Sequence, residues 1–186
     1  LSLNTKAKQL KESGADVIGL TAGEPDFDTP ELIKKAAEKA IEEGKTKYTP
    51  AAGIRQLREA VAEVYSKKLG VQYTAEGGVI SHGAKHSIFK ALFTLLDPGD
   101  EVLILSPYWT SYPEMVKIVG GKPRIVELGA DTGYRLTAEL LKNEAAKGKP
   151  KVLLFNSPGN PAGIVYSKDE LASLAAVLLE EKIALI

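Results

Sequence analysis

Residues 79–80 form a strand candidate that leads into Ser81-His82-Gly83-Ala84-Lys85, after which the sequence becomes helical and apolar. Such a turn leaves the first backbone N–H groups of the helix without partners, at the positive end of the helix dipole. These N–H groups stabilise a phosphate, and the Lys85 ammonium can add to them. Simple turn chemistry is the alternative, because the segment matches neither G-x-G-x-x-G nor the P-loop pattern.

Two later segments also follow strand candidates and carry groups suited to a flat ligand. Trp109 is the only tryptophan and closes the segment after the strand candidate 101–105. Its indole can stack on an aromatic ring, although a core or interface position is the commoner fate. The segment 156–163 holds two prolines, two glycines and two asparagines. The prolines stiffen it, so that Asn160 can direct its carboxamide at a ligand; an Asx-turn is the alternative.

Alternating strand and helix candidates are expected to position these groups. We predict strands at residues 16–20, 79–80, 101–105, 124–128, 151–155 and 183–186. We predict helices at 29–44, capped by Thr29, at 54–70, 84–96 and 109–119, and from Thr137 and Ser167 onward. The helix at 84–96 is apolar on most faces and is expected to be buried. The last helix begins with a capping box and carries a stripe of buried leucines, namely Leu171, Leu174, Leu178 and Leu179.

This order of elements predicts an α/β fold with three layers. Its sheet is expected to be mostly parallel, with right-handed crossovers and helices on both faces. An N-terminal helical segment precedes it. Ligands of such sheets bind at the carboxyl ends of the strands, and the three candidate segments follow strand candidates.

Composition excludes several classes of protein. The chain has 186 residues, 24 basic and 24 acidic side chains, and no cysteine. Zero net charge argues against a nucleic-acid partner, and the lack of cysteine excludes disulfides and thiol nucleophiles. No apolar run approaches the ~18 residues of a membrane span. We therefore predict a soluble, cytoplasmic protein without a membrane partner. His82 and His86 have no third ligand, so no metal is predicted.

The motifs together closely resemble class I aspartate aminotransferases, which are fold-type-I enzymes dependent on pyridoxal phosphate. The resemblance runs over essentially all 186 residues, in order and with matching spacing. The motifs that carry it are Gly23-Glu24-Pro25-Asp26-Phe27, Lys47-Tyr48, Gly83-Ala84-Lys85, Asp97-Pro98-Gly99-Asp100, Pro107-Tyr108-Trp109 and Asn160-Pro161-Ala162-Gly163. Ala162 stands where the family usually has threonine.

The resemblance implies roles toward pyridoxal 5'-phosphate and the substrates. The backbone amides of Gly83, Ala84 and Lys85 would hold the cofactor phosphate. Trp109 would stack on the pyridine ring, and Asn160 would bond the phenolic oxygen. Tyr48 would reach the phosphate of the neighbouring subunit, which implies a homodimer. The substrates would be an L-amino acid such as aspartate and a 2-oxo acid, and the residues that contact them would be Gly23, Trp109 and Asn160.

The resemblance also implies that no catalytic residue lies in this chain. The Schiff-base lysine, the aspartate at the pyridine nitrogen and the arginine for the substrate carboxylate all lie further along in the family. Neither Lys47 nor Lys85 replaces that lysine, so the 186 residues alone are expected to be inactive. Residues 1–45 would be an N-terminal segment with part of the small domain, and 46–186 an incomplete large cofactor-binding domain.

Two alternatives stay open. The chain could be an inactive or engineered fragment that acts at most as a module binding phosphate or cofactor. It could also belong to a related pyridoxal-phosphate lyase or synthase, because such enzymes share these loops.

Overall fold

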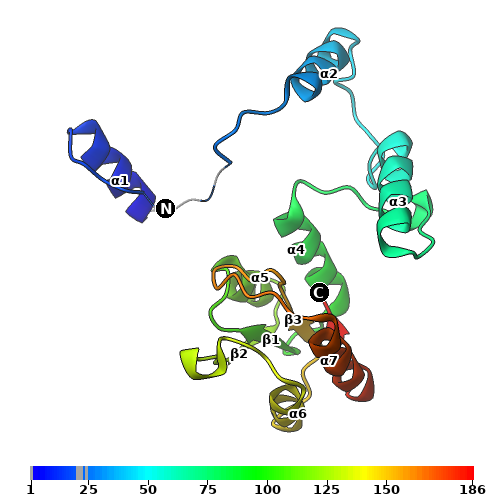
Figure 1. The fold of residues 1–186 in the computed structure, drawn as a ribbon. Coiled ribbons are helices and arrows are strands. Elements are labelled where there is room, and N and C mark those ends of the chain that lie inside the picture. The colour runs from blue at the N-terminus through cyan, green and yellow to red at the C-terminus, as the bar shows by residue number, and fades with distance from the viewer. Residues whose placement is uncertain (1, 20–22, 24) are drawn as a thin grey trace. The chain divides into compact units, whose positions relative to one another are not determined.

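The computed structural model describes residues 2–19, 23 and 25–186 of the chain, which is divided into two compact units, Leu1–Pro50 and Ala51–Ile186 (Figure 1). The first unit contains the helices α1 (Ser2–Glu12) and α2 (Glu31–Glu42). None of the side chains described in this unit is buried. Its helices therefore have no apolar core of their own.

The second unit contains a parallel sheet with the strand order β2-β1-β3-β4. The strands are β1 (Glu101–Leu105), β2 (Lys122–Val126), β3 (Val152–Leu154) and β4 (Ala184–Leu185). The helices are α3 (Arg55–Leu69), α4 (Ala84–Leu95), α5 (Ser111–Ile118), α6 (Ala138–Ala146) and α7 (Lys168–Glu180), with short 3-10 turns η1 (Ala75–Gly77) and η2 (Ala130–Thr132). The α/β fold predicted from the sequence is confirmed.

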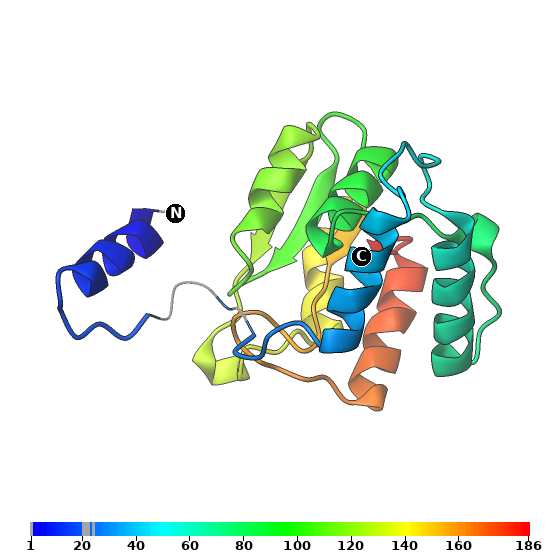
Figure 2. The ribbon, with the colours of Figure 1, turned by 90° about the horizontal axis from the view of Figure 1, so that it is seen from above.

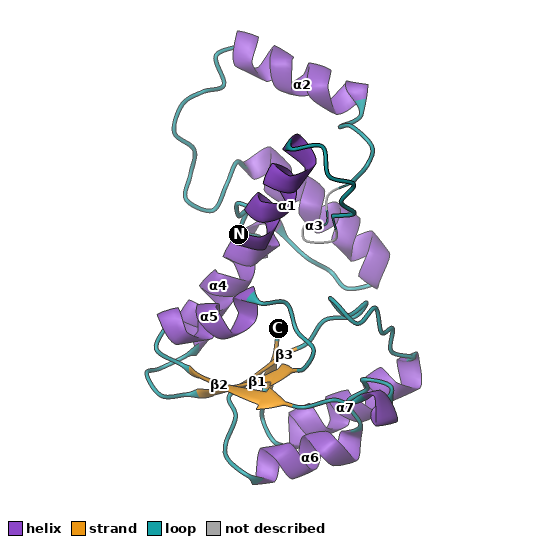
Figure 3. Cartoon of the chain, turned by 90° about the vertical axis from the view of Figure 1, so that its left-hand side faces the viewer, coloured by secondary structure: helices purple, strands orange, loops and turns teal. Residues whose placement is uncertain are grey.

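Side chains of β1 alternate between two apolar clusters. The helices α4 and α5 lie on one face of the sheet, and α6 and α7 lie on the other (Figure 3). Leu103 packs into a cluster with side chains of α6 and α7, whereas Val102 and Ile104 pack into a second cluster with α4 and α5. All three side chains have no exposed surface. In Figure 2, α6 (yellow) and α7 (orange to red) lie side by side, and they contact each other. Helices therefore cover both faces, as predicted.

After β1 the chain first adds β2 on one side of β1, and then adds β3 and β4 on the other side. The helix α5 connects β1 to the edge strand β2, after which α6 crosses back to β3 and α7 leads on to β4. The connections that leave β1 and β3 therefore lie on opposite faces of the sheet. In doubly wound sheets, ligands bind outside the carboxyl ends of two such strands.

Two predicted strands do not form. Residues 16–19 have no regular secondary structure, and Leu20 lies outside the described residues. Residues 79–80 are also not a strand, and the Ile80 N–H donates to the Ala52 carbonyl at 3.0 Å instead. A short apolar run becomes a strand only when a neighbouring strand takes up its hydrogen bonds, and the described part of the chain supplies none here.

The remaining differences concern boundaries and burial. The strand β2 begins and ends two residues earlier than predicted, and the helix expected at 109–119 spans Ser111–Ile118. The helix α4 is less buried than expected, because Leu92 is its only buried residue and Phe93 is 69% exposed. Thr29 does not cap α2; its N–H donates to Asp28 Oδ1 at 2.8 Å and Pro30 takes the N-cap position.

The capping box predicted for α7 is confirmed. Ser167 Oγ accepts the Glu170 N–H, and Glu170 Oε2 accepts the Ser167 N–H at 2.7 Å. The predicted leucine stripe is half right, and Leu179 is exposed because it projects roughly 100° away from its neighbour Leu178 on the helix. Its buried members are Leu174 and Leu178, and its exposed members are Leu171 and Leu179. No helix in the described ranges is long and apolar enough to cross a membrane.

Candidate functional site

At the N-terminus of α4, the Gly83 N–H donates to the Ser81 carbonyl at 2.9 Å, whereas the N–H groups of Ala84 and Lys85 have no hydrogen-bond partner in the part of the chain that the structure describes. Gly83 occupies the N-cap position with φ +82° and ψ 170°, a conformation that only glycine adopts readily, and it supplies no side-chain cap. A Cβ atom at Gly83 would meet nothing within 4 Å, so open space lies beside this turn. Ser81 Oγ is buried and has no hydrogen-bond partner among the described residues. The turn has the free donors and the room that a phosphate requires.

Lys85 and Trp109 lie together in the structure. Lys85 Nζ lies 4.8 Å from the centroid of the Trp109 ring, in a cation–π contact. The Tyr112 ring meets the Trp109 ring edge-on at 5.5 Å between centroids. A continuous series of contacts therefore links the first turn of α4 to the loop after β1 and the start of α5.

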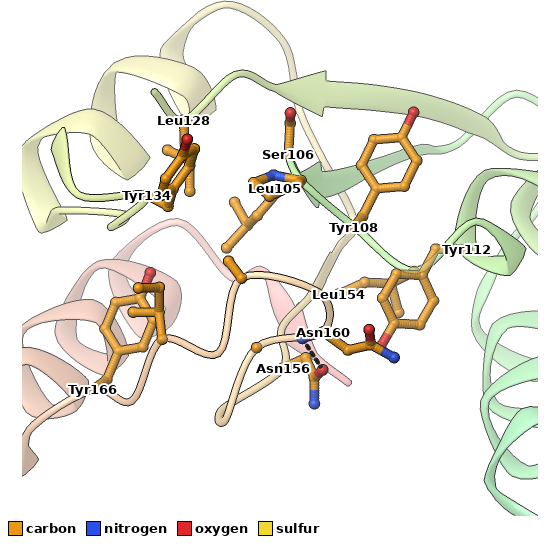
Figure 4. A pocket seen from close by; sticks show the side chains of 14 residues that line it. Leu105, Ser106, Tyr108, Tyr112, Leu128, Tyr134, Leu154, Asn156, Asn160 and Tyr166 are labelled. Atoms are coloured by element: carbon orange, nitrogen blue, oxygen red, sulfur yellow. Dashed lines mark hydrogen bonds between the residues drawn. The ribbon is translucent and has the colours of Figure 1, made fainter. Parts of the chain in front are cut away.

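The loops after β1 and β3 face each other across a small pocket (Figure 4). Ser106, Tyr108 and Tyr112 line it from the β1 side, and Asn156 and Asn160 line it from the β3 side. The side chain of Tyr112 points toward the loop that carries Asn160 (Figure 4). Burial raises the pKa of the Tyr112 hydroxyl above its ordinary value of 10.0, so Tyr112 is a neutral donor at neutral pH.

The two asparagines of the β3 loop differ in their contacts. Asn156 Oδ1 accepts the backbone N–H of Asn160 at 2.9 Å. The side chain of Asn160 has no hydrogen-bond partner within the described ranges. The Asx-type bond considered for Asn160 is therefore made by Asn156. The peptide bonds before Pro107, Pro158 and Pro161 are cis.

The remaining candidates are two residues of the first unit and the two histidines. Gly23 and Tyr48 belong to the unit Leu1–Pro50, where both are exposed, and their roles stay predictions. The rings of His82 and His86 stack at 5.6 Å. No group of three or more histidine, aspartate or glutamate side chains in the described part of the chain is arranged to hold a metal ion.

Tyr112 and Asn156 are among the pocket residues that sequence reasoning missed. Tyr112 follows Trp109 by three positions, which is the spacing that places two side chains on one helix face. Asn156 directly follows the predicted strand at residues 151–155, and this position at a strand end could have indicated a site residue. The family motif pointed to Asn160 instead.

Taken together, the fold and this site define a doubly wound α/β domain in which a helix N-terminus lies against the aromatic side chains that follow strand β1. The chain belongs to the aminotransferase class I and II family, whose model matches residues 15–186.

Individual relatives agree with this assignment. The chain is 46% identical over 179 residues to the aspartate/prephenate aminotransferase of Cereibacter sphaeroides, covering 96% of this chain and 44% of that protein. It is 44% identical to the aspartate aminotransferase of Bacillus subtilis, covering 100% and 47%. The aspartate aminotransferase from Thermus thermophilus, solved with maleate, matches with a TM-score of 0.92 at 45% identity, covering 99% and 48%. The chain thus spans about half the length of these relatives.

Proposed function

We propose that the chain is a portion of a pyridoxal-phosphate-dependent aminotransferase. The intact enzyme would be a cytoplasmic homodimer that moves an amino group between an L-amino acid such as aspartate and a 2-oxo acid. The observation that carries the proposal is the contact between Lys85 and Trp109, beside a pocket shared by the loops after β1 and β3. An anion-binding turn, an indole and a carboxamide then serve one ligand. The relatives named above have this activity in their names.

Each group has a separate task in this proposal. The first amides of α4 hold the phosphate by hydrogen bonds and by the helix dipole, and they anchor one end of the ligand. The indole of Trp109 fixes the plane of the ring. The Asn160 carboxamide donates to an oxygen on the ring and so sets its rotation within that plane. When bound, pyridoxal phosphate supplies the electron sink for the amino-group transfer.

The residues of this chain bind and orient, and none of them is assigned the proton transfer. Neither Lys85 nor Lys47 is proposed as the covalent partner of the cofactor, because Lys85 lies over the indole and Lys47 directly precedes Tyr48 in the other unit. We therefore expect the 186 residues alone not to transaminate. The lysine would come from sequence outside this chain.

The test uses the full-length polypeptide that carries these residues. It should show a visible absorption band with pyridoxal phosphate, retain the cofactor covalently after borohydride treatment, and transfer the amino group of L-aspartate to a 2-oxo acid. The 186-residue chain is the matched comparison. It should neither retain the cofactor covalently after borohydride treatment nor transfer the amino group. Borohydride fixation at one lysine of the 186-residue chain, together with transaminase activity, would refute the assignment of the missing lysine.

A further inference from the structure

We propose that Asn156 is a positioning residue for Asn160. Its carboxamide oxygen fixes the backbone of Asn160, so that the Asn160 side chain is presented to the ligand pocket. This inference rests on the proposed function, because the ligand is taken to be pyridoxal phosphate. It adds a residue for which the family resemblance suggested no role.

Asn156 is well placed to act as an anchor because it directly follows the sheet. The preceding residue, Phe155, donates its N–H to the Ile186 carbonyl at 2.8 Å and so continues the pairing beyond β3. From this fixed point, Asn156 Oδ1 accepts the Asn160 N–H at 2.9 Å, across four residues (Figure 4). The hydrogen bond ties the tip of the loop back to the end of a buried strand.

The rest of the loop closes on itself around this bond. The Gly159 N–H donates to the Ile164 carbonyl at 2.9 Å, and the Gly163 N–H donates to the Gly159 carbonyl at 2.7 Å. Pro158 and Pro161 have no N–H to donate, so the Asn160 N–H is one of few backbone donors at the tip. Its bond to Asn156 therefore has a large share in setting where Asn160 lies.

The arrangement divides two tasks between two identical side chains. Both side chains line the pocket, but Asn156 uses its carboxamide oxygen on the backbone, whereas the Asn160 carboxamide has no partner in the described ranges. A donor held toward a ring oxygen favours the ionised form of that oxygen and lowers its pKa. Removing the Asn156 acceptor should weaken that effect while the Asn160 donor itself is kept.

The first arm of the test needs no cofactor. In the full-length polypeptide, hydrogen exchange of the Asn160 amide should be about fivefold to tenfold faster in Asn156→Ala, because the amide loses one hydrogen bond. Asn156→Asp keeps an acceptor oxygen and should restore slow exchange. Asn143→Ala, which removes an exposed carboxamide of α6, is the matched control and should leave the exchange unchanged.

The second arm follows the bound cofactor by its visible absorption. The pH midpoint of the absorption change should rise by about half a pH unit in Asn156→Ala, in the same direction as in Asn160→Ala and by less. Because Asn156 acts through Asn160, the double variant should match Asn160→Ala alone.

The outcomes separate the two proposals. A normal cofactor band with an unmoved midpoint in Asn156→Ala, or additive shifts in the double variant, would overturn the positioning role and leave the proposed function intact. Unchanged exchange of the Asn160 amide in Asn156→Ala would also overturn that role. A wild-type protein without any cofactor band would overturn the proposed function, and the role of Asn156 toward the cofactor with it.

Discussion

The indole of Trp109 is held by two neighbours of different chemistry. The Lys85 ammonium lies over one face of the ring, and the Tyr112 ring stands nearly perpendicular to it, at an interplanar angle of 89°. The tryptophan is therefore oriented before any ligand arrives. Under the proposed function, a planar ligand would stack on this indole, and the first turn of α4, which carries Lys85, would bind the phosphate of the same molecule.

Replacing Trp109 tests the stacking role directly. In the full-length polypeptide, Trp109→Ala should raise the dissociation constant for pyridoxal phosphate about tenfold, because an aromatic pair contributes up to about 1.5 kcal/mol beyond its buried area. Trp109→Phe keeps an aromatic face and should lose less. Titration of the apoenzyme, followed by cofactor absorbance, measures both. Equal affinity in wild type and Trp109→Ala would remove the stacking role.

At the scale of elements, the turn before β1 and the start of α7 were predicted correctly, but the absence of strand pairing at residues 16–19 and 79–80 was not. The strand β1 begins directly after the turn at residues 97–100, as predicted, and α7 begins after the Ser167 capping box, as predicted. Residues 79–80 are equally apolar, yet whether they pair depends on distant segments that periodicity does not reveal. Likewise, the motif could place Asn160 at a strand end. It could not show which of the two asparagines accepts a backbone hydrogen bond with its side chain.

The capping box offers a test of how α7 is started. Ser167→Ala removes the acceptor for the Glu170 N–H and should lower the free energy of unfolding by about 1 kcal/mol. Ser173→Ala is the control on the same helix, because that exposed hydroxyl only donates to the Asp169 carbonyl within the helix. Urea denaturation compares the two variants, and an equal loss in both would contradict the capping role.

A second element-scale contact joins the start of β3 to the turn before β1. Lys151 Nζ lies 2.6 Å from Asp100 Oδ2. The Lys151 ammonium, followed by the Asp97 N–H, lowers the pKa of the Asp100 carboxyl below its ordinary value of 3.8. A carboxyl with a lowered pKa in the folded state contributes stability that is present above its ordinary pKa and is lost as the pH falls through the folded value.

The pH dependence of stability should report this contact. Asp100→Asn should be less stable than wild type at pH 7, and the difference should shrink as the pH falls below about 3.8. Urea midpoints measured from pH 7 to pH 3 check this, with the exposed Asp131→Asn as the control. A difference that stays constant across this range would show that the charge of Asp100 does not contribute.

For the molecule as a whole, the two units differ in what supports their helices. In the second unit, the strands β1 and β3 lie between two apolar clusters, and five of their side chains are fully buried: Val102, Leu103, Ile104, Val152 and Leu153. In the first unit, α1 and α2 have 11 and 12 residues and no buried side chain in the part described. Helices of this length are marginal in water without tertiary packing.

Hydrogen exchange on the 186-residue chain should therefore divide at the boundary between Pro50 and Ala51. Backbone amides of β1 and β3 should exchange about a thousandfold or more slowly than those of α1 and α2, because they open only when the whole sheet opens. Exchange of both helices close to the rate of an unstructured chain, beside strong protection of residues 102–104 and 152–154, is the expected pattern. Equal protection in α2 and β1 would mean that packing stabilises the first unit as strongly as the core of the second. Weak protection throughout would mean that the sheet needs sequence beyond this chain to be stable.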